Sequence, residues 1–201
     1  GTLPTEMWNP DTNVWTAMAS VHEPRLYHSS SALLPDGRVV VGGGGSLVGN
    51  QDHPNLEYFS PPYLFKGPRP TITSAPATAS YGNALTVTTP DAASITKVSL
   101  IPLGAVTHTS DMNQRYLELP FTAGGNSLTV GGPTGPTYAP PGNYMLFVLN
   151  GQGVPSTAAI VRLTTAAGTS TPTPVATQTP TATPAAPTAT PTPTVPPAAW
   201  E

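Results

Sequence analysis

The sequence contains no cysteine, few charged residues and no long hydrophobic run. Without cysteine there is no disulfide framework and no thiolate metal site. Charged residues make up 8% of the 201 residues, the net charge is −3, and no basic cluster occurs, so we expect no nucleic-acid partner. No apolar stretch approaches the roughly 18 residues that a membrane-spanning helix needs, so we expect no membrane span.

Glycine and proline are abundant instead, with 19 and 27 residues. No window has convincing helical periodicity, so the sequence predicts an all-β protein of short strands and turns. The length allows one or two small domains with a buried core. The chain begins at Gly1 with neither an initiator methionine nor a signal peptide, which indicates the back end of a longer protein.

Residues 166–201 consist mainly of threonine, proline and alanine. Such a segment has too little apolar surface to offset the entropy of ordering, so we expect a disordered, extended linker. Linkers of this composition commonly join modules of secreted proteins. The tail therefore favours an extracellular location and a further module, such as a carbohydrate-binding one, beyond the linker.

Residues 1–66 carry the pattern of an incomplete propeller-blade region. Trp8 and Trp15 flank an Asn-Pro-Asp-Thr turn, which predicts either the outer strands of a blade or a simple hairpin. Two further strands, at 30–34 and 38–41, should be joined by a tight Pro-Asp-Gly turn and followed by an outer strand at 56–64. The four glycines at 42–45 allow close backbone approach, as in kelch-type blades. One blade cannot close a propeller, so this region should be poorly stable by itself.

Residues 67–165 contain strand patterns at intervals of roughly ten residues, separated by turn signals. This spacing predicts an immunoglobulin-like β-sandwich. Residues 144–149 would place apolar side chains on both faces of a strand, as expected for a strand in the centre of a sheet. The expected strands are 85–88, 95–103, 116–119, 128–130, 144–149 and 158–163.

Tyr27, His28 and His108 are the candidate metal ligands. Two imidazoles and a phenol without a thiolate suit a tetragonal copper site better than a structural zinc site. Adjacent side chains on a regular strand point to opposite faces, so Tyr27 and His28 can share a metal only if the backbone there is irregular or at a strand end. His22 and His53 are interpreted as ordinary loop residues.

The residue strings around these positions have a distinctive order. They are Arg-Leu-Tyr-His-Ser at 25–29, Leu-Leu-Pro-Asp-Gly-Arg-Val-Val-Val followed by four glycines at 33–45, Thr-His-Thr at 107–109, Gln-Arg at 114–115, Pro-Gly-Asn-Tyr-Met-Leu-Phe-Val-Leu-Asn at 141–150 and Gly-Val-Pro-Ser at 153–156. Together, over roughly residues 1–165, they resemble the C-terminal third of the galactose oxidase and glyoxal oxidase family of copper radical oxidases.

This resemblance implies an early-set sandwich after a seven-bladed propeller, of which only the last blade region is present. It implies that Tyr27 is an axial copper ligand and the catalytic general base, and that His28 and His108 are equatorial copper ligands. The parent would be a secreted oxidase of primary alcohols or aldehydes that reduces O2 to H2O2. The family's second redox group is a Tyr-Cys pair, expected from a missing upstream region because this chain has no cysteine. We therefore expect the chain alone to be inactive.

An alternative is a non-catalytic kelch and early-set protein that binds carbohydrate or a cell surface, because a fold does not fix a function. An upstream Tyr and Cys would favour the oxidase. In a third interpretation the sandwich is itself a carbohydrate-binding module; against it, Tyr81, Tyr116 and Tyr138 are scattered and form no aromatic row.

Overall fold

The structure, a computed structural model, describes residues 3–45, 52–108, 110–165, 172–174 and 199–200. These residues form strands, connecting loops and two short 3-10 helices, which confirms the all-β prediction. The elements are β1 (Glu6–Asn9), β2 (Val14–Ala17), β3 (Ser29–Leu33), β4 (Val39–Gly43), β5 (Leu56–Ser60), η1 (Pro62–Phe65), β6 (Ser74–Pro76), β7 (Thr78–Ser80), β8 (Ala84–Thr88), η2 (Ala92–Ser94), β9 (Ile95–Pro102), β10 (Val106–Thr107), β11 (Ser110–Asp111), β12 (Leu117–Leu119), β13 (Phe121–Gly124), β14 (Ser127–Gly131), β15 (Gly142–Asn150), β16 (Ala159–Thr164), β17 (Pro172–Pro174) and β18 (Ala199–Trp200).

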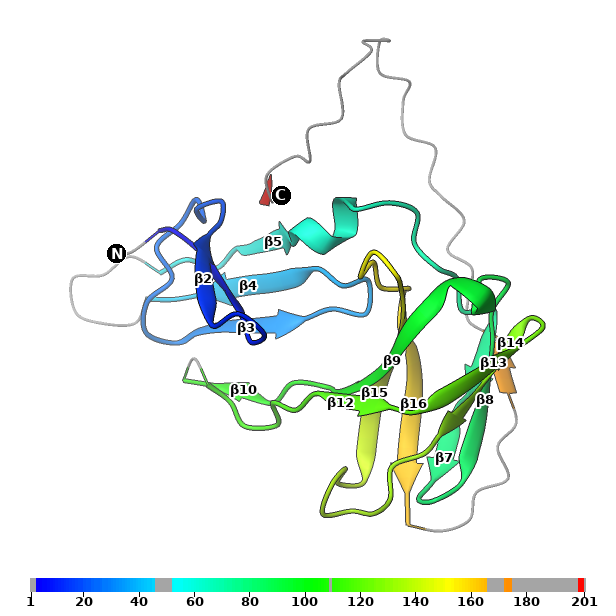
Figure 1. Ribbon diagram of the computed structural model, residues 1–201. Helices are drawn as coiled ribbons and strands as arrows, with labels where there is room; N and C mark the ends of the chain where they lie inside the picture. Colours follow the sequence, from blue (N-terminus) through cyan, green and yellow to red (C-terminus); the bar gives the residue numbers. More distant parts are fainter. Residues whose placement is uncertain (1–2, 46–51, 109, 166–171, 175–198, 201) are drawn as a thin grey trace, which may run out of the picture.

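The C-terminal half is a sandwich of two five-stranded sheets (Figure 1). Their strand orders are β12-β9-β15-β16-β7 and β13-β14-β8-β6-β17. Alternate residues of both sheets point inward, so Leu100 and Leu146 of the first sheet and Val87 and Leu128 of the second are completely buried. The predicted immunoglobulin-like sandwich is confirmed.

The central strand β15 is buried on both faces, as its sequence predicts. Tyr144, Leu146 and Val148 belong to the core between the sheets. Met145 and Phe147 point to the opposite face, where they form a second apolar cluster with Ala158. Leu33 of the N-terminal half packs against this cluster, as do Ile101 of β9 and Leu149 of β15.

β3, β4 and β5 of the N-terminal half form a four-stranded antiparallel sheet with β18 from the other end of the chain, in the order β18-β5-β4-β3. A tight turn joins β3 to β4 where the sequence predicts it. The Gly37 amide donates to the carbonyl oxygen of Leu34 at 2.9 Å, and Gly37 has a φ of +84°, which favours glycine. The Arg38 amide donates to the Asp36 carboxylate at 3.0 Å, which stabilises the turn further.

The Trp8 and Trp15 segment forms a separate two-stranded sheet, β1-β2. Trp8 and Trp15 are paired across the two strands with ring centroids 6.3 Å apart, and both are exposed. The side chain of Asn9 accepts hydrogen bonds from the amides of Asp11 at 2.9 Å and Thr12 at 3.4 Å in the turn. A hairpin of this kind is compatible with both interpretations of the segment.

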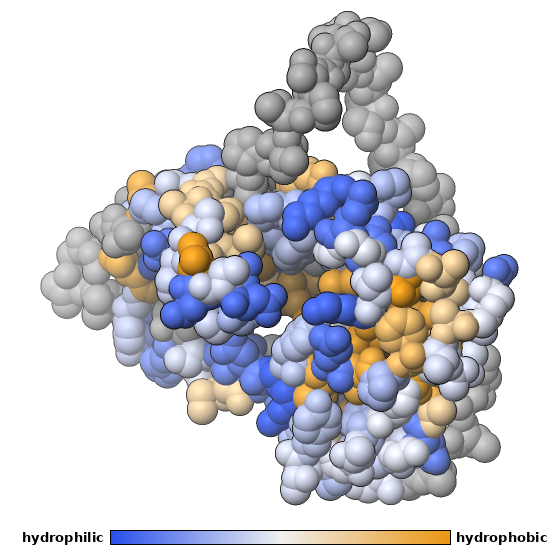
Figure 2. All heavy atoms as spheres, viewed as in Figure 1, coloured by the Kyte–Doolittle hydropathy of each residue, from blue (hydrophilic) through white to orange (hydrophobic). Residues whose placement is uncertain are grey.

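Direct contacts join the two halves of the chain. The Ala158 amide donates to the carbonyl oxygen of Pro35 at 2.8 Å. Arg69, at the start of the sandwich, donates to the carbonyl oxygens of Pro155 at 2.9 Å and Ser156 at 2.8 Å, which fixes the segment that follows η1 against the same loop. A cavity of about 160 Å³ remains at this junction, with Leu33 among its apolar lining residues. Figure 2 shows further hydrophobic residues exposed over the sandwich on the face in view.

The predicted boundaries at 1–66, 67–165 and 166–201 stay a prediction. Most of the Thr/Pro-rich segment 166–201, expected to be disordered, lies outside the described residues. Its two described pieces are short strands: β17 pairs with β6, and β18 pairs with β5. Within the described part of the chain, no helix has the length and apolar character needed to span a membrane.

Candidate metal centre

Tyr27 and His28 occupy a turn immediately before β3. The Ser29 amide donates to the carbonyl oxygen of Leu26 at 3.1 Å, and His28 has a φ of +62°. This left-handed conformation breaks the alternation of a regular strand, as the sequence requires if both side chains are to meet one metal. The rings of Tyr27 and His28 are stacked, with centroids 3.9 Å apart.

The glycine run at the end of β4 lies directly behind this turn. The Gly45 amide donates to the carbonyl oxygen of Tyr27 at 3.1 Å. A Cβ atom on Gly43 would lie 3.0 Å from the carbonyl oxygen of His28, and one on Gly44 would lie 3.3 Å from the Leu26 nitrogen. The predicted close backbone approach is confirmed, and its partner is the turn that carries the candidate ligands.

We expect Gly43→Ala to displace this turn, and Gly82→Ala provides a matched control. The two glycines have φ values of +71° and +72°, but a Cβ atom on Gly82 meets nothing within 4 Å. Both changes should cost about 1 kcal/mol for the left-handed conformation. Gly43→Ala should cost at least about 1 kcal/mol more in urea unfolding, because of the contact with His28, and should shift the Ser29 and Gly45 amide resonances. Equal losses in the two variants would contradict this prediction.

His108 reaches the same region from the sandwich. It lies at the tip of the hairpin β10-β11, which extends from the sandwich to β3 (Figure 1). At the hairpin base, the Asp111 carboxylate accepts hydrogen bonds from the amides of Ala105 and Asn113, each at 2.9 Å. His108 also has a positive φ, +50°. Its Nδ1 lies 2.8 Å from the hydroxyl oxygen of Thr107, a contact that orients the imidazole ring.

The three predicted ligands are therefore brought together from two distant parts of the sequence. The ring centroid of His108 lies 6.1 Å from that of Tyr27 and 5.7 Å from that of His28. Among the described residues, no group of three or more His, Cys, Asp or Glu could hold a metal ion. The third donor here is a phenol, and two imidazoles with one phenol form a nitrogen and oxygen set suited to Cu(II). The assignment of these residues as ligands stays a prediction.

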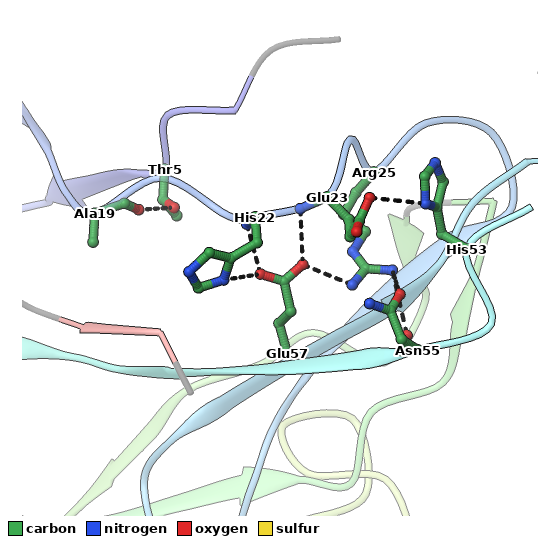
Figure 3. A network of polar contacts seen from close by, with 8 residues as sticks. All are labelled: Thr5, Ala19, His22, Glu23, Arg25, His53, Asn55 and Glu57. Atoms are coloured by element: carbon green, nitrogen blue, oxygen red, sulfur yellow. Dashed lines mark hydrogen bonds and ion pairs between the residues drawn. The ribbon is translucent and has the colours of Figure 1, made fainter. Parts of the chain in front are cut away.

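A buried network of ionic and polar groups lies beside the turn (Figure 3). The side chains of Arg25 and Glu57 are 7% and 6% exposed, and Nη2 of Arg25 donates to Oε1 of Glu57 at 2.7 Å. Nη1 of Arg25 donates to the carbonyl oxygen of Gly43 at 2.9 Å and to the Asn55 side chain at 3.0 Å. The amide of His22 donates to Oε2 of Glu57 at 2.7 Å.

These contacts control the charge of Glu57. Burial alone would raise the pKa of the Glu57 carboxyl group. The hydrogen bonds from the His22 amide, Arg25, the Glu23 amide and the His22 ring act in the opposite direction. Their combined effect lowers the pKa from 4.5 to about 2, so Glu57 is ionised at neutral pH.

The remaining histidines lie in loops, and their rings contact carboxylates. Nδ1 of His22 lies 3.0 Å from Glu57, and Nδ1 of His53 lies 3.1 Å from Glu23. Their interpretation as loop residues is confirmed.

Sequence reasoning missed Glu57 as a neighbour of the site and assigned no role to Thr107. Glu57 had a detectable signal, because it shares a strand face with the buried Phe59, and a carboxylate at such a position requires a partner.

Comparisons with known proteins agree with this architecture. Residues 69–163 match the family model described as galactose oxidase-like, early set domain. The chain is 44% identical over 149 residues to galactose oxidase of Gibberella zeae, an alignment that covers 70% of this chain and 22% of that protein. It is 34% identical over 159 residues to aldehyde oxidase GLOX of Vitis pseudoreticulata, with 70% and 30% coverage.

A solved structure is also similar, that of a fungal alcohol oxidase of the AA5 family in complex with copper. The TM-score is 0.73 at 33% identity, over 81% of this chain and 36% of that one. The chain thus spans about a fifth to a third of the length of the two oxidases compared by sequence. Residues 69–163 form a galactose oxidase-like early-set domain, and the chain is a homologue of part of galactose oxidase and the GLOX aldehyde oxidases.

Proposed function

We propose that the chain is the C-terminal part of a secreted copper radical oxidase and contributes three ligands to its copper site. The observation that carries this proposal is the convergence of Tyr27, His28 and His108 within ring-centroid distances of 3.9 to 6.1 Å. The similarity to a copper-bound alcohol oxidase supports the choice of metal. A Thr/Pro-rich segment like 166–201 is typical of secreted multidomain proteins and supports the location.

The proposed reaction is the two-electron oxidation of a primary alcohol, or of a hydrated aldehyde, coupled to reduction of O2 to H2O2. When bound, copper supplies one of the two oxidising equivalents. The other would come from a tyrosyl radical outside residues 1–201, because this chain contains no cysteine for a Tyr-Cys pair.

Each residue of the chain has a distinct part in this proposal. His28 and His108 hold the metal through ring nitrogens, and Thr107 fixes the orientation of His108. Tyr27 is 45% exposed, so its oxygen could meet a substrate hydroxyl group and, in the phenolate form, would accept its proton and become a phenol. The positive φ of both histidines is the kind of strained conformation that clusters at functional sites.

The decisive experiment is Cu(II) titration of the 201-residue chain with an electron paramagnetic resonance readout. We expect one bound copper with nitrogen hyperfine structure. His28→Asn and His108→Asn should each weaken binding by more than the roughly 10- to 100-fold that loss of a ligand's hydrogen-bond partner costs. Asparagine is the best replacement here, because it tolerates the left-handed backbone of both positions.

His22→Gln is the matched control, since it removes an exposed imidazole and keeps a donor for Glu57. It should leave copper affinity unchanged. The copper-loaded chain should also produce no H2O2 from an alcohol above a protein-free control. Failure to bind copper, or equal affinity in all three histidine variants, would contradict the proposal and favour a non-catalytic carbohydrate- or surface-binding protein.

A further inference from the structure

We infer that the Arg25–Glu57 pair is a positioning device that sets the geometry of the Tyr27–His28 turn, and thereby of the proposed copper site. The copper part of this inference rests on the proposed function. Neither residue touches the rings of Tyr27, His28 or His108 in any contact described above. Their effect is exerted through the backbone on both sides of the turn.

One side is the segment that enters the turn. Glu57 of β5 accepts the amides of His22 at 2.7 Å and Glu23 at 3.3 Å, so its carboxylate fixes the backbone just before Arg25. Arg25 then donates to the same carboxylate at 2.7 Å. The chain is thus held at three residues, which lie two to five positions before Tyr27.

The other side is the glycine run behind the turn. Nη1 of Arg25 donates to the carbonyl oxygen of Gly43, at 2.9 Å, and to the backbone and side-chain oxygens of Asn55, at 3.3 and 3.0 Å. Gly43 is the residue whose Cβ would lie 3.0 Å from the His28 carbonyl oxygen. The guanidinium group therefore fixes the position of the turn relative to β5 and to the end of β4.

An arginine is needed for this geometry. Its planar fork reaches Gly43 and Glu57 with different nitrogens, whereas a lysine ammonium group cannot span both. The arrangement also has a cost, because Nε of Arg25 is buried without a hydrogen-bond partner among the described residues. A lysine would avoid that cost, but it would lose the simultaneous contacts with Gly43 and Glu57.

The test compares Arg25→Lys and Glu57→Gln with the control Glu118→Gln, which alters a half-exposed ion pair with Lys97 on the sandwich. Amide hydrogen exchange of the copper-free 201-residue chain is measured first. The Ser29 and Gly45 amides donate to the carbonyl oxygens of Leu26 and Tyr27. Both amides should exchange roughly 10- to 100-fold faster in the two network variants, Arg25→Lys and Glu57→Gln, because each variant loses a charged hydrogen bond of the pair. The amides that pair β4 with β5 should change less, and the control should change neither group.

Cu(II) paramagnetic resonance at saturating copper is measured second. Altered copper hyperfine parameters in both network variants, with the parent spectrum in Glu118→Gln, would support the inference. Uniform acceleration of all sheet amides with an unchanged copper spectrum would overturn it, since the pair would then have a structural role only. Absence of copper binding by the parent chain would contradict the proposed function instead, and selective exchange at Ser29 and Gly45 would still establish that the pair positions the turn.

Discussion

Replacement of Phe147 by alanine is expected to lower the free energy of unfolding by about 3 to 5 kcal/mol. Phe147 lies in the middle of β15, is 3% exposed and points away from the main core of the sandwich. Leu33 of β3 packs against the apolar cluster to which Phe147 belongs, so this cluster joins the sandwich to the N-terminal sheet. Phe147 also lines the existing cavity of about 160 Å³ at this junction. Truncation to alanine enlarges that cavity, and the surrounding side chains can fill only part of the space that the ring leaves.

The control for this prediction is Ile160→Ala on the adjacent strand β16, where the side chain is 45% exposed. Such a surface change should cost no more than about 1 kcal/mol. Urea unfolding followed by circular dichroism measures both values. A loss for Phe147→Ala no larger than that for Ile160→Ala would show that the junction does not stabilise the protein.

Acidification is expected to remove about 3 kcal/mol of stability through Glu57 alone. The pKa of Glu57 is lowered from 4.5 to about 2 in the folded state, and each pH unit of this difference corresponds to about 1.4 kcal/mol. Because the folded-state pKa is the lower one, this stabilisation is fully present above pH 4.5 and is lost as the pH falls toward 2. About 2 kcal/mol should be lost by pH 3.

The measurement is urea unfolding at pH 6, 4.5 and 3 for the parent chain and for Glu57→Gln. The ionisable side chains that contact Glu57 are those of His22 and Arg25, and both remain in the variant. At pH 6 the variant should be less stable than the parent, and its stability should fall less between pH 4.5 and 3. Parallel pH profiles for the two proteins would show that the carboxylate of Glu57 does not contribute this acid sensitivity.

Much of the sandwich could be predicted from the sequence, because its long strands have unambiguous patterns. The predicted strand at 144–149 corresponds to β15, and the predicted strand at 95–103 corresponds to β9. The strands β6 and β7 were not predicted. They have three residues each, contain small residues and proline, and belong to different sheets, with Ala77 between them. Their pairing, including the parallel register of β7 with β16, depends on residues far away in the sequence.

The residues of the candidate site could be predicted from the sequence, but the contacts that hold them in place could not. Tyr27, His28 and His108 stand out because of their neighbouring strings, and the irregular backbone at Tyr27 follows from strand geometry. The contact between Glu57 and Arg25 could not be inferred, since it joins residues 32 positions apart through a buried face of a short strand. The positive φ of His108 was equally inaccessible, because it depends on how the β10-β11 hairpin is held at its base.

The left-handed backbone of His28 and His108 has a consequence for protein engineering. A free peptide containing Arg-Leu-Tyr-His-Ser would favour negative φ at its histidine, because an L-residue pays about 1 kcal/mol or more for the opposite choice. Such a peptide would separate the phenol and imidazole that the folded chain stacks at 3.9 Å. Transplanting this donor set into another scaffold therefore requires the glycine run and the hairpin to be transplanted with it.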